Sequence, residues 1–227
     1  MERVSETSPV LWEDNHVIVV FKAPGVLTQG DITGVLSLLD ETKAWLKSKY
    51  DKPGNVFLGL VHRLDRPCRG AILFAKTSKA ASRISEQIRN RRFHKIYRIC
   101  VEGTLIQPSG TWVDWLAPMD QFQMTVVQEG APGAQRAELH YRTLESRGQK
   151  HLVEVNLITG RKHQIRAQFA HRGLPVVGDV KYGAQPTHRE GIALMSYSLE
   201  FAHPTKDESI IVTVPNHFIQ EFHDFLL

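Results

Sequence analysis

Short apolar runs predict most of the regular elements of this chain. The runs at residues 16–21, 56–61 and 70–75 are short and mostly rich in β-branched side chains, which is typical of buried β-strands. Residues 94–102 alternate between the two faces of a predicted strand. Similar patterns predict more strands over residues 136–145, 151–158, 192–201 and 209–214.

Helical patterns are fewer. Residues 77–90 predict a helix that Thr77 or Ser78 caps, residues 161–172 predict a short helix, and residues 216–226 predict a final one. The predicted strands outnumber these helices, and several strands are joined by short turns. The sequence therefore predicts an α+β fold, in which helices flank a mostly antiparallel mixed β-sheet.

Composition indicates an ordinary globular protein. Hydrophobic residues make up 42% of the 227 residues, which is enough to build a sizeable core, and we expect a single domain over residues 1–227. No stretch of about 18 apolar residues and no signal-type start is present, so we expect no membrane association and a cytoplasmic location. Cys68 and Cys100 lack the spacing of a zinc site, and we expect no metal.

Positive charge is concentrated in two segments, although the formal net charge is only +4. Residues 83–98 carry six Lys or Arg residues against one acid, and residues 161–172 carry four and no acid. Such clusters suit a polyanion such as nucleic acid. The alternative interpretation is that each segment is simply a solvated helix face.

The apolar run at 56–61 ends in the polar sequence His62-Arg63-Leu64-Asp65-Arg66. Burial at a strand end raises the pKa of a carboxyl group, and a nearby arginine lowers it again. Asp65 is therefore either a structural ion-pair residue or a reactive carboxylate. Motifs for P-loop nucleotide hydrolysis, dinucleotide binding, serine hydrolysis and zinc hydrolysis are absent from the sequence.

A second segment, "TGRKHQIRAQFAHRG", follows the strand at 151–158. Helical spacing would place Lys162 and Arg166 on one face, and the turn at Gly160 offers backbone N–H groups to an anion. Taken alone, this segment also fits a basic helix that faces solvent.

Together these segments resemble the RluA family of RNA pseudouridine synthases. "HRLDRPCRGAILFAK" resembles the catalytic motif of that family, and "LITGRKHQIRAQF" with "GLPVVGDVKYG" resembles its later motifs. "HKIY" resembles its K-x-Y segment and "VIVVFKAPGVLTQ" its first motif. The order and spacing agree from about residue 12 to residue 183.

The resemblance implies that uridine in RNA is isomerised to pseudouridine without a metal or organic cofactor. Asp65 corresponds to the essential aspartate of the family, Tyr97 to its active-site tyrosine and Arg166 to the arginine that pairs with the aspartate. It also implies a central active-site cleft. Whether Asp65 attacks the sugar or the base, or assists a proton shift, stays open.

RNA is then the expected partner, as a stem-loop of rRNA or tRNA bound by a monomer. We expect His62 or Arg63 to fill the space that the flipped uridine leaves. The residues expected to contact RNA are His62, Arg63, Arg66, Arg69, Lys76, Arg91, Arg92, Lys95, Arg161, Lys162, His163 and Gln164.

The chain departs from the family pattern at two places. Cys68-Arg69 replaces the usual Thr-Ser pair, and Ala23 displaces the proline of the first motif by one position. We expect the Cys68-Arg69 pair to bear on loop geometry and substrate choice, and the displaced proline to be a minor variation of the turn. Because the first motif begins near residue 12, we expect no N-terminal S4 RNA-binding domain.

Two other functions compete with this one. A non-catalytic RNA-binding or ribosome-assembly protein would explain the basic segments but not the joint presence of Asp65, Tyr97 and Arg166. A nucleoside or glycoside hydrolase would need a second carboxylate. Its candidates are Glu102, Asp114 and Asp179, none of which lies in a convincing motif.

Overall fold

The computed structural model describes residues 1–105 and 107–227, which fall into two compact units. Unit 1 consists of residues 1–93 and 196–214, and unit 2 of residues 94–195 and 215–227. Both units combine antiparallel strand pairs with helices, so the predicted α+β fold class is confirmed.

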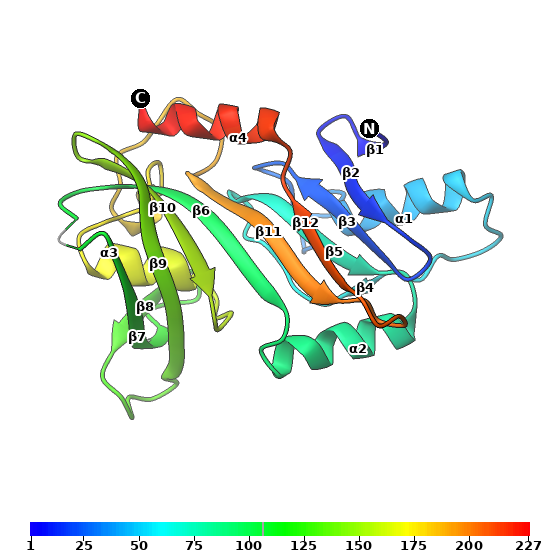
Figure 1. Cartoon of the computed structure of the whole chain (residues 1–227), viewed down its shortest axis with the longest axis horizontal. Coiled ribbons are helices and arrows are strands. Elements are labelled where there is room, and N and C mark those ends of the chain that lie inside the picture. Colours follow the sequence, from blue (N-terminus) through cyan, green and yellow to red (C-terminus); the bar gives the residue numbers. More distant parts are fainter. Residues whose placement is uncertain (106) are drawn as a thin grey trace. The chain divides into compact units, whose positions relative to one another are not determined.

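Unit 1 is built on a sheet with the strand order β1-β2-β3-β5-β11, with β4 paired to β5 and β12 to β11 (Figure 1). β3 pairs with β2 and β5, and its side chains are buried on both faces of the sheet, which explains its continuous apolar run. The elements are β1 (Arg3–Ser5), β2 (Ser8–Glu13), β3 (Val17–Lys22), α1 (Leu38–Lys49), β4 (Gly59–Leu60), β5 (Arg69–Ala75), α2 (Ser78–Arg89), β11 (Leu194–Ala202, in unit 1 from Ser196) and β12 (Ser209–Thr213).

The helices of unit 1 start at well-formed caps. The Thr77 side chain accepts a hydrogen bond from the Ala80 N–H at the start of α2, as the sequence indicated. At the start of α1, the side chains and backbone N–H groups of Ser37 and Asp40 form a reciprocal capping box. Helix α1 is not among the elements predicted above, although this Ser-x-x-Asp pattern is a signal for it.

The strand predicted over residues 56–61 is mostly wrong. Only Gly59 and Leu60 pair with β5, as β4. A side chain at Gly59 would meet the Cβ atom of Ala81 at 2.9 Å, because α2 packs directly against this point. The segment before it runs without regular structure, and the Phe57 ring is half exposed.

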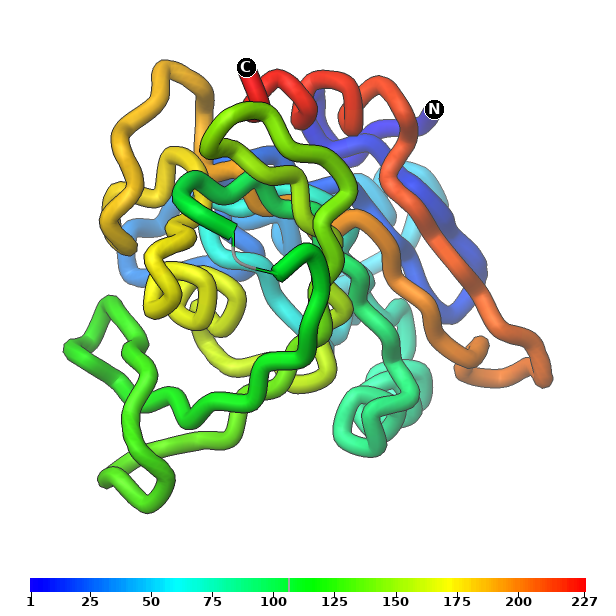
Figure 2. Tube along the Cα trace, turned by 60° about the vertical axis from the view of Figure 1, so that its left-hand side comes forward, coloured from blue at the N-terminus to red at the C-terminus, as the bar shows by residue number. Residues whose placement is uncertain are grey.

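Unit 2 is built on a sheet with the order β6-β10-β9-β7-β8, whose strands are all antiparallel neighbours. Helix α3 packs on β7 and β8, where Ala167 meets Leu116 and Met124. β8 is the edge strand of this sheet, and Figure 2 shows the β7–β8 region in green. The elements are β6 (His94–Glu102), β7 (Ser109–Pro118), β8 (Met124–Val127), β9 (Gln135–Arg147), β10 (Lys150–Leu157), α3 (Gln164–His171), a 3-10 turn (Val180–Tyr182), α4 (Asn216–His223) and a last 3-10 turn (Asp224–Leu226).

The strand predicted over residues 94–102 coincides with β6, and those over 136–145 and 151–158 agree with β9 and β10 within two residues at each end. The helix predicted over 161–172 begins three residues late. β7 and β8 were not predicted. In the described part of the chain, no helix is long and apolar enough to cross a membrane.

Candidate active site

Asp65 lies in unit 1, on a turn between β4 and β5. The Cys68 N–H donates to the Asp65 carbonyl at 3.0 Å and closes this turn. Thr28 fixes the preceding residue, since its Oγ1 donates to the Leu64 carbonyl at 2.8 Å and accepts from the Leu64 N–H at 3.2 Å. The Leu64 side chain is buried, which anchors the turn in the core. The position of Asp65 is thus fixed by its neighbours on both sides.

Lys22 at the end of β3 provides the second anchor for this turn. Its side chain is fully buried, and its ammonium group donates to the carbonyls of Cys68 at 2.7 Å, Arg66 at 3.1 Å and Ala23 at 3.1 Å. An ammonium group has three N–H donors, so these carbonyls match it one for one. The Lys22 ammonium therefore joins the chain after β3 to the chain after Asp65.

Two more hydrogen bonds reinforce the same junction. The Gly25 N–H donates to the Arg66 carbonyl at 2.9 Å, and the Arg66 Nε–H donates back to the Gly25 carbonyl at 2.9 Å. Gly25 has a φ of 80°, which glycine adopts without strain. The sequence indicated no role for Lys22, although a lysine that directly continues a buried strand was a signal.

Burial of Lys22 has an electrostatic cost. Desolvation lowers the pKa of its ammonium group from 10.5 to about 8, although the nearby Cys68 and Asp65 act in the opposite direction. The hydrogen bonds to three carbonyls and this nearby negative charge are what make a buried cation tolerable at this position.

His62 and Arg63 precede Asp65 and differ in their surroundings. The His62 Nε2 atom accepts a hydrogen bond from the Leu73 N–H at 3.0 Å, and its ring lies 5.5 Å from that of Phe93. Arg63 is exposed, and within the described residues no carboxylate or carbonyl binds its guanidinium group. An arginine that supports the fold would be engaged, so Arg63 is available for a ligand.

In unit 2, Tyr97 and Lys95 lie on one face of β6, two residues apart. Both side chains are buried, with exposed fractions of 6% and 8%. β6 pairs with β10, where Tyr97 lies opposite Val155. The strand therefore presents a phenol and an ammonium group side by side from a rigid support.

The turn before α3 is held by a side chain rather than by helical hydrogen bonds. Gln164 is buried, and its Oε1 accepts from the Thr159 hydroxyl at 2.7 Å and from the Arg161 N–H at 3.0 Å. Its Nε2 donates to the Glu138 carbonyl at 3.1 Å. His163 adopts a left-handed φ of 52°, so regular helix begins only after it. Lys162 thus lies outside the helix.

Arg166 is buried in unit 2 and forms a two-point ion pair with Asp179. The distances are 2.6 Å from Nε to Oδ2 and 2.7 Å from Nη2 to Oδ1. The Tyr182 ring lies 4.9 Å from the guanidinium carbon, and its hydroxyl is 2.9 Å from the His163 Nδ1 atom. Breaking one side of such a buried pair costs about 3–5 kcal/mol, so Asp179 fixes the orientation of Arg166.

The other predicted RNA contacts divide by exposure. Lys76 is engaged with the Glu13 carboxylate at 2.6 Å, and Gln164 is buried in its turn, so both support the fold. Arg69 and His163 are half-buried. The exposed ones are Arg63, Arg66, Arg91, Arg92, Arg161 and Lys162. Asp65 belongs to unit 1, whereas Tyr97 and Arg166 belong to unit 2.

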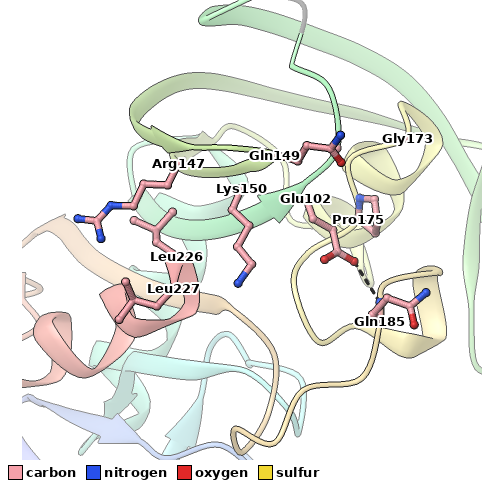
Figure 3. Close-up of a pocket in the computed structure, with 10 residues that line it drawn as sticks. Glu102, Arg147, Gln149, Lys150, Gly173, Pro175, Gln185, Leu226 and Leu227 are labelled. Carbon is pink, nitrogen blue, oxygen red and sulfur yellow. Dashed lines mark hydrogen bonds between the residues drawn. The ribbon is translucent and has the colours of Figure 1, made fainter.

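A pocket of about 580 Å³ lies elsewhere in unit 2, at the Glu102 end of β6 (Figure 3). The Glu102 carboxylate accepts from the Gln185 N–H at 3.0 Å on one wall, and Leu226 and Leu227 form another. No residue of the predicted site lines it. Among the described residues, no group of three His, Cys, Asp or Glu side chains could hold a metal ion.

Comparison with known proteins gives a consistent result. Residues 16–171 match the family model for RNA pseudouridylate synthase. A Bacillus subtilis protein, "Uncharacterized RNA pseudouridine synthase YhcT", is 32% identical over 91% of this chain and 68% of its own length. The ribosomal large subunit pseudouridine synthase D of Xanthomonas campestris is 31% identical over 91% of this chain and 65% of its own length. The chain thus spans about two thirds of these relatives.

Solved structures show the same fold. The human RNA Pseudouridylate Synthase Domain Containing 4 superposes with a TM-score of 0.78 at 23% identity, covering 96% of this chain and 92% of the human chain. At this identity the likeness concerns the fold alone.

The state of Lys22 predicts a pH dependence of stability. Between pH 8 and 10.5 the unfolded chain keeps the Lys22 proton while the folded chain loses it, so the free energy of unfolding rises with pH in this window. Relative to Lys22→Met, the wild type should gain on the order of 1 kcal/mol per pH unit there, and nothing below pH 8. Urea unfolding of both proteins from pH 6 to 10 measures this difference. Parallel profiles would show that Lys22 is not desolvated as described.

Proposed function

The chain belongs to the RluA family of RNA pseudouridine synthases, and we propose that it isomerises specific uridines of a structured RNA to pseudouridine. The observation that carries the proposal is the construction around Asp65. A buried ammonium group, a threonine and a closed turn fix the backbone that carries Asp65, at the centre of the family motif. Rigid positioning of this kind is expected for a residue that takes part in a reaction.

The reaction exchanges one bond for another. The bond from uracil N1 to ribose C1′ breaks and a bond from C5 to C1′ forms, while the C5 proton leaves and N1 gains a proton. We assign Asp65 as the essential carboxylate, which acts as an ionised group on either the sugar or the base. Since nothing is oxidised and the atoms balance within the nucleotide, the assignment calls for no cofactor.

Tyr97 and Arg166 are assigned supporting roles in the same reaction. We assign the Tyr97 ring to stack against uracil and its hydroxyl to move the C5 proton. Arg166 is assigned as the counter-charge that keeps Asp65 ionised. Asp179 engages two N–H donors of this guanidinium group and fixes its orientation.

The proposed substrate is a stem-loop of rRNA or tRNA, encountered in the cytoplasm. One of the relatives described above is named for the large ribosomal subunit, so large-subunit rRNA is the first RNA to test. The exposed cations Arg91, Arg92, Arg161 and Lys162 would contact its phosphates, which makes binding weaken as salt increases.

Tritium release tests the reaction and the role of Asp65. RNA transcripts labelled with tritium at uracil C5 should lose label to water with the wild type, whereas Asp65→Asn should release less than about one-thousandth as fast, since it lacks the ionised carboxylate. Asp207→Asn, which changes an exposed aspartate of the same unit, should match the wild type. Tight binding without release from rRNA or tRNA would instead identify a non-catalytic RNA-binding protein.

Arg63 is proposed to fill the space left by the flipped uridine. Because it is exposed and unengaged within the described residues, Arg63→Ala should leave stability unchanged. It should lower kcat/KM about tenfold, since stacking on a base is worth about 1–3 kcal/mol. Arg3→Ala, at another exposed arginine, serves as the control. Unchanged RNA affinity and turnover in Arg63→Ala would refute this role.

A further inference from the structure

Lys95 is a buried cation for which the fold provides no counterpart. Its side chain is 8% exposed, yet within the described residues no carboxylate or carbonyl accepts a hydrogen bond from its ammonium group. Burial lowers the pKa of Lys95, and no neighbouring charge opposes that effect. A buried charge without a partner is costly, so a reason for keeping it is needed.

Two other lysines of low exposure have partners that offset the burial of their charge. Lys22 donates to three carbonyls, and Lys76 binds the Glu13 carboxylate at 2.6 Å and the Asp14 carbonyl at 2.5 Å. Both are thus fixed by the protein itself. Lys95 differs from them because its partner is absent from the described chain.

The Lys95 ammonium group lies directly against the turn that precedes α3. A Cβ atom built on Gly160 would come within 3.0 Å of the Lys95 Nζ atom, so a glycine at this position keeps the space over the ammonium group open. Gly160 is itself exposed, which puts the buried ammonium group next to the surface. A ligand can therefore reach it without displacing a side chain of residue 160.

The charges around this turn favour an anion. Residues 159–164 contain Arg161, Lys162 and no acid. Glu138, whose carbonyl accepts from the Thr159 N–H, has its carboxylate bound to Arg136 at 2.7 Å. The charged side chains that residues 159–164 contribute are therefore positive.

We propose that Lys95, at the open face of Gly160, binds a phosphate of the RNA strand next to the uridine that reacts. The proposal rests on the proposed function and extends it. A phosphate would supply the negative charge that no carboxylate of the described residues provides to Lys95. It also forms charge-assisted hydrogen bonds with an ammonium group. Because Lys95 and Tyr97 share one face of β6, the phosphate contact and the aromatic ring are held in fixed register.

NMR of lysine side chains tests the contact directly. In protein labelled at lysine Nζ and Cε, the Lys95 signal is identified by its loss in Lys95→Met. Titration with uridine 3′-monophosphate or inorganic phosphate should shift this signal saturably and raise the pKa of Lys95, whereas uridine should do neither. A Lys95 signal that phosphate leaves in place would overturn the proposal.

Stability separates a ligand-binding lysine from a structural one. Lys95→Met removes an uncompensated charge, so its urea midpoint should equal or exceed that of the wild type. The exposed Lys181 provides the matched control, Lys181→Met, which should leave both stability and the Lys95 signal unchanged. A clear fall in the midpoint of Lys95→Met would show a structural role instead.

RNA binding gives the functional readout. With large-subunit rRNA, Lys95→Met should bind about 10- to 100-fold more weakly, as expected for the loss of hydrogen bonds to a charged group. The slope of log affinity against log salt should become shallower by about one, and Lys181→Met should keep the wild-type slope. An unchanged affinity and slope would contradict the proposal. The NMR result does not depend on isomerisation, so failure of the proposed function would appear separately, as absent tritium release.

Discussion

The three hydrogen bonds of the buried Lys22 ammonium group are the contact on which the proposed active site depends. Two of them join Lys22 to the carbonyls of Arg66 and Cys68, which lie 44 and 46 positions later in the sequence and belong to the turn that carries Asp65. A carboxylate must approach a reacting atom within fractions of an ångström, and a loop held only by its ends would not ensure this. Here a desolvated cation with matched acceptors supplies the rigidity, at the electrostatic cost that its lowered pKa reports.

Unit 2 uses the same principle with a different set of groups. Arg166 is oriented by the carboxylate of Asp179 and the ring of Tyr182, and the Gln164 amide shapes the turn beside them. In both units the side chains assigned to the reaction are supported by buried polar contacts rather than by exposed ion pairs. Lys95 differs, because no carboxylate or carbonyl of the described residues binds its ammonium group. This missing partner is the reason for proposing a ligand there.

The sequence predicted the elements whose pattern is local and missed those set by packing. The strand His94–Glu102 coincides with its alternating pattern, whereas the run at 56–61 pairs only at β4, where Gly59 lies against helix α2. The helix that contains Arg166 starts later than predicted, because the left-handed His163 and the buried amide of Gln164 shape the turn before it, and hydrophobic periodicity does not reveal such a turn. Motif resemblance identified the candidate residues but not the hydrogen bonds that hold them.

The most direct test of this account is turnover by Lys22→Met, measured as tritium release from C5-labelled RNA beside Lys76→Met. Both variants remove a lysine of low exposure, but only Lys22 binds the turn that carries Asp65. With folding confirmed by circular dichroism, Lys22→Met should bind RNA normally and release tritium about 100-fold more slowly, while Lys76→Met should keep near-normal turnover. A folded Lys22→Met protein with wild-type turnover would contradict the claim that this lysine positions the catalytic carboxylate.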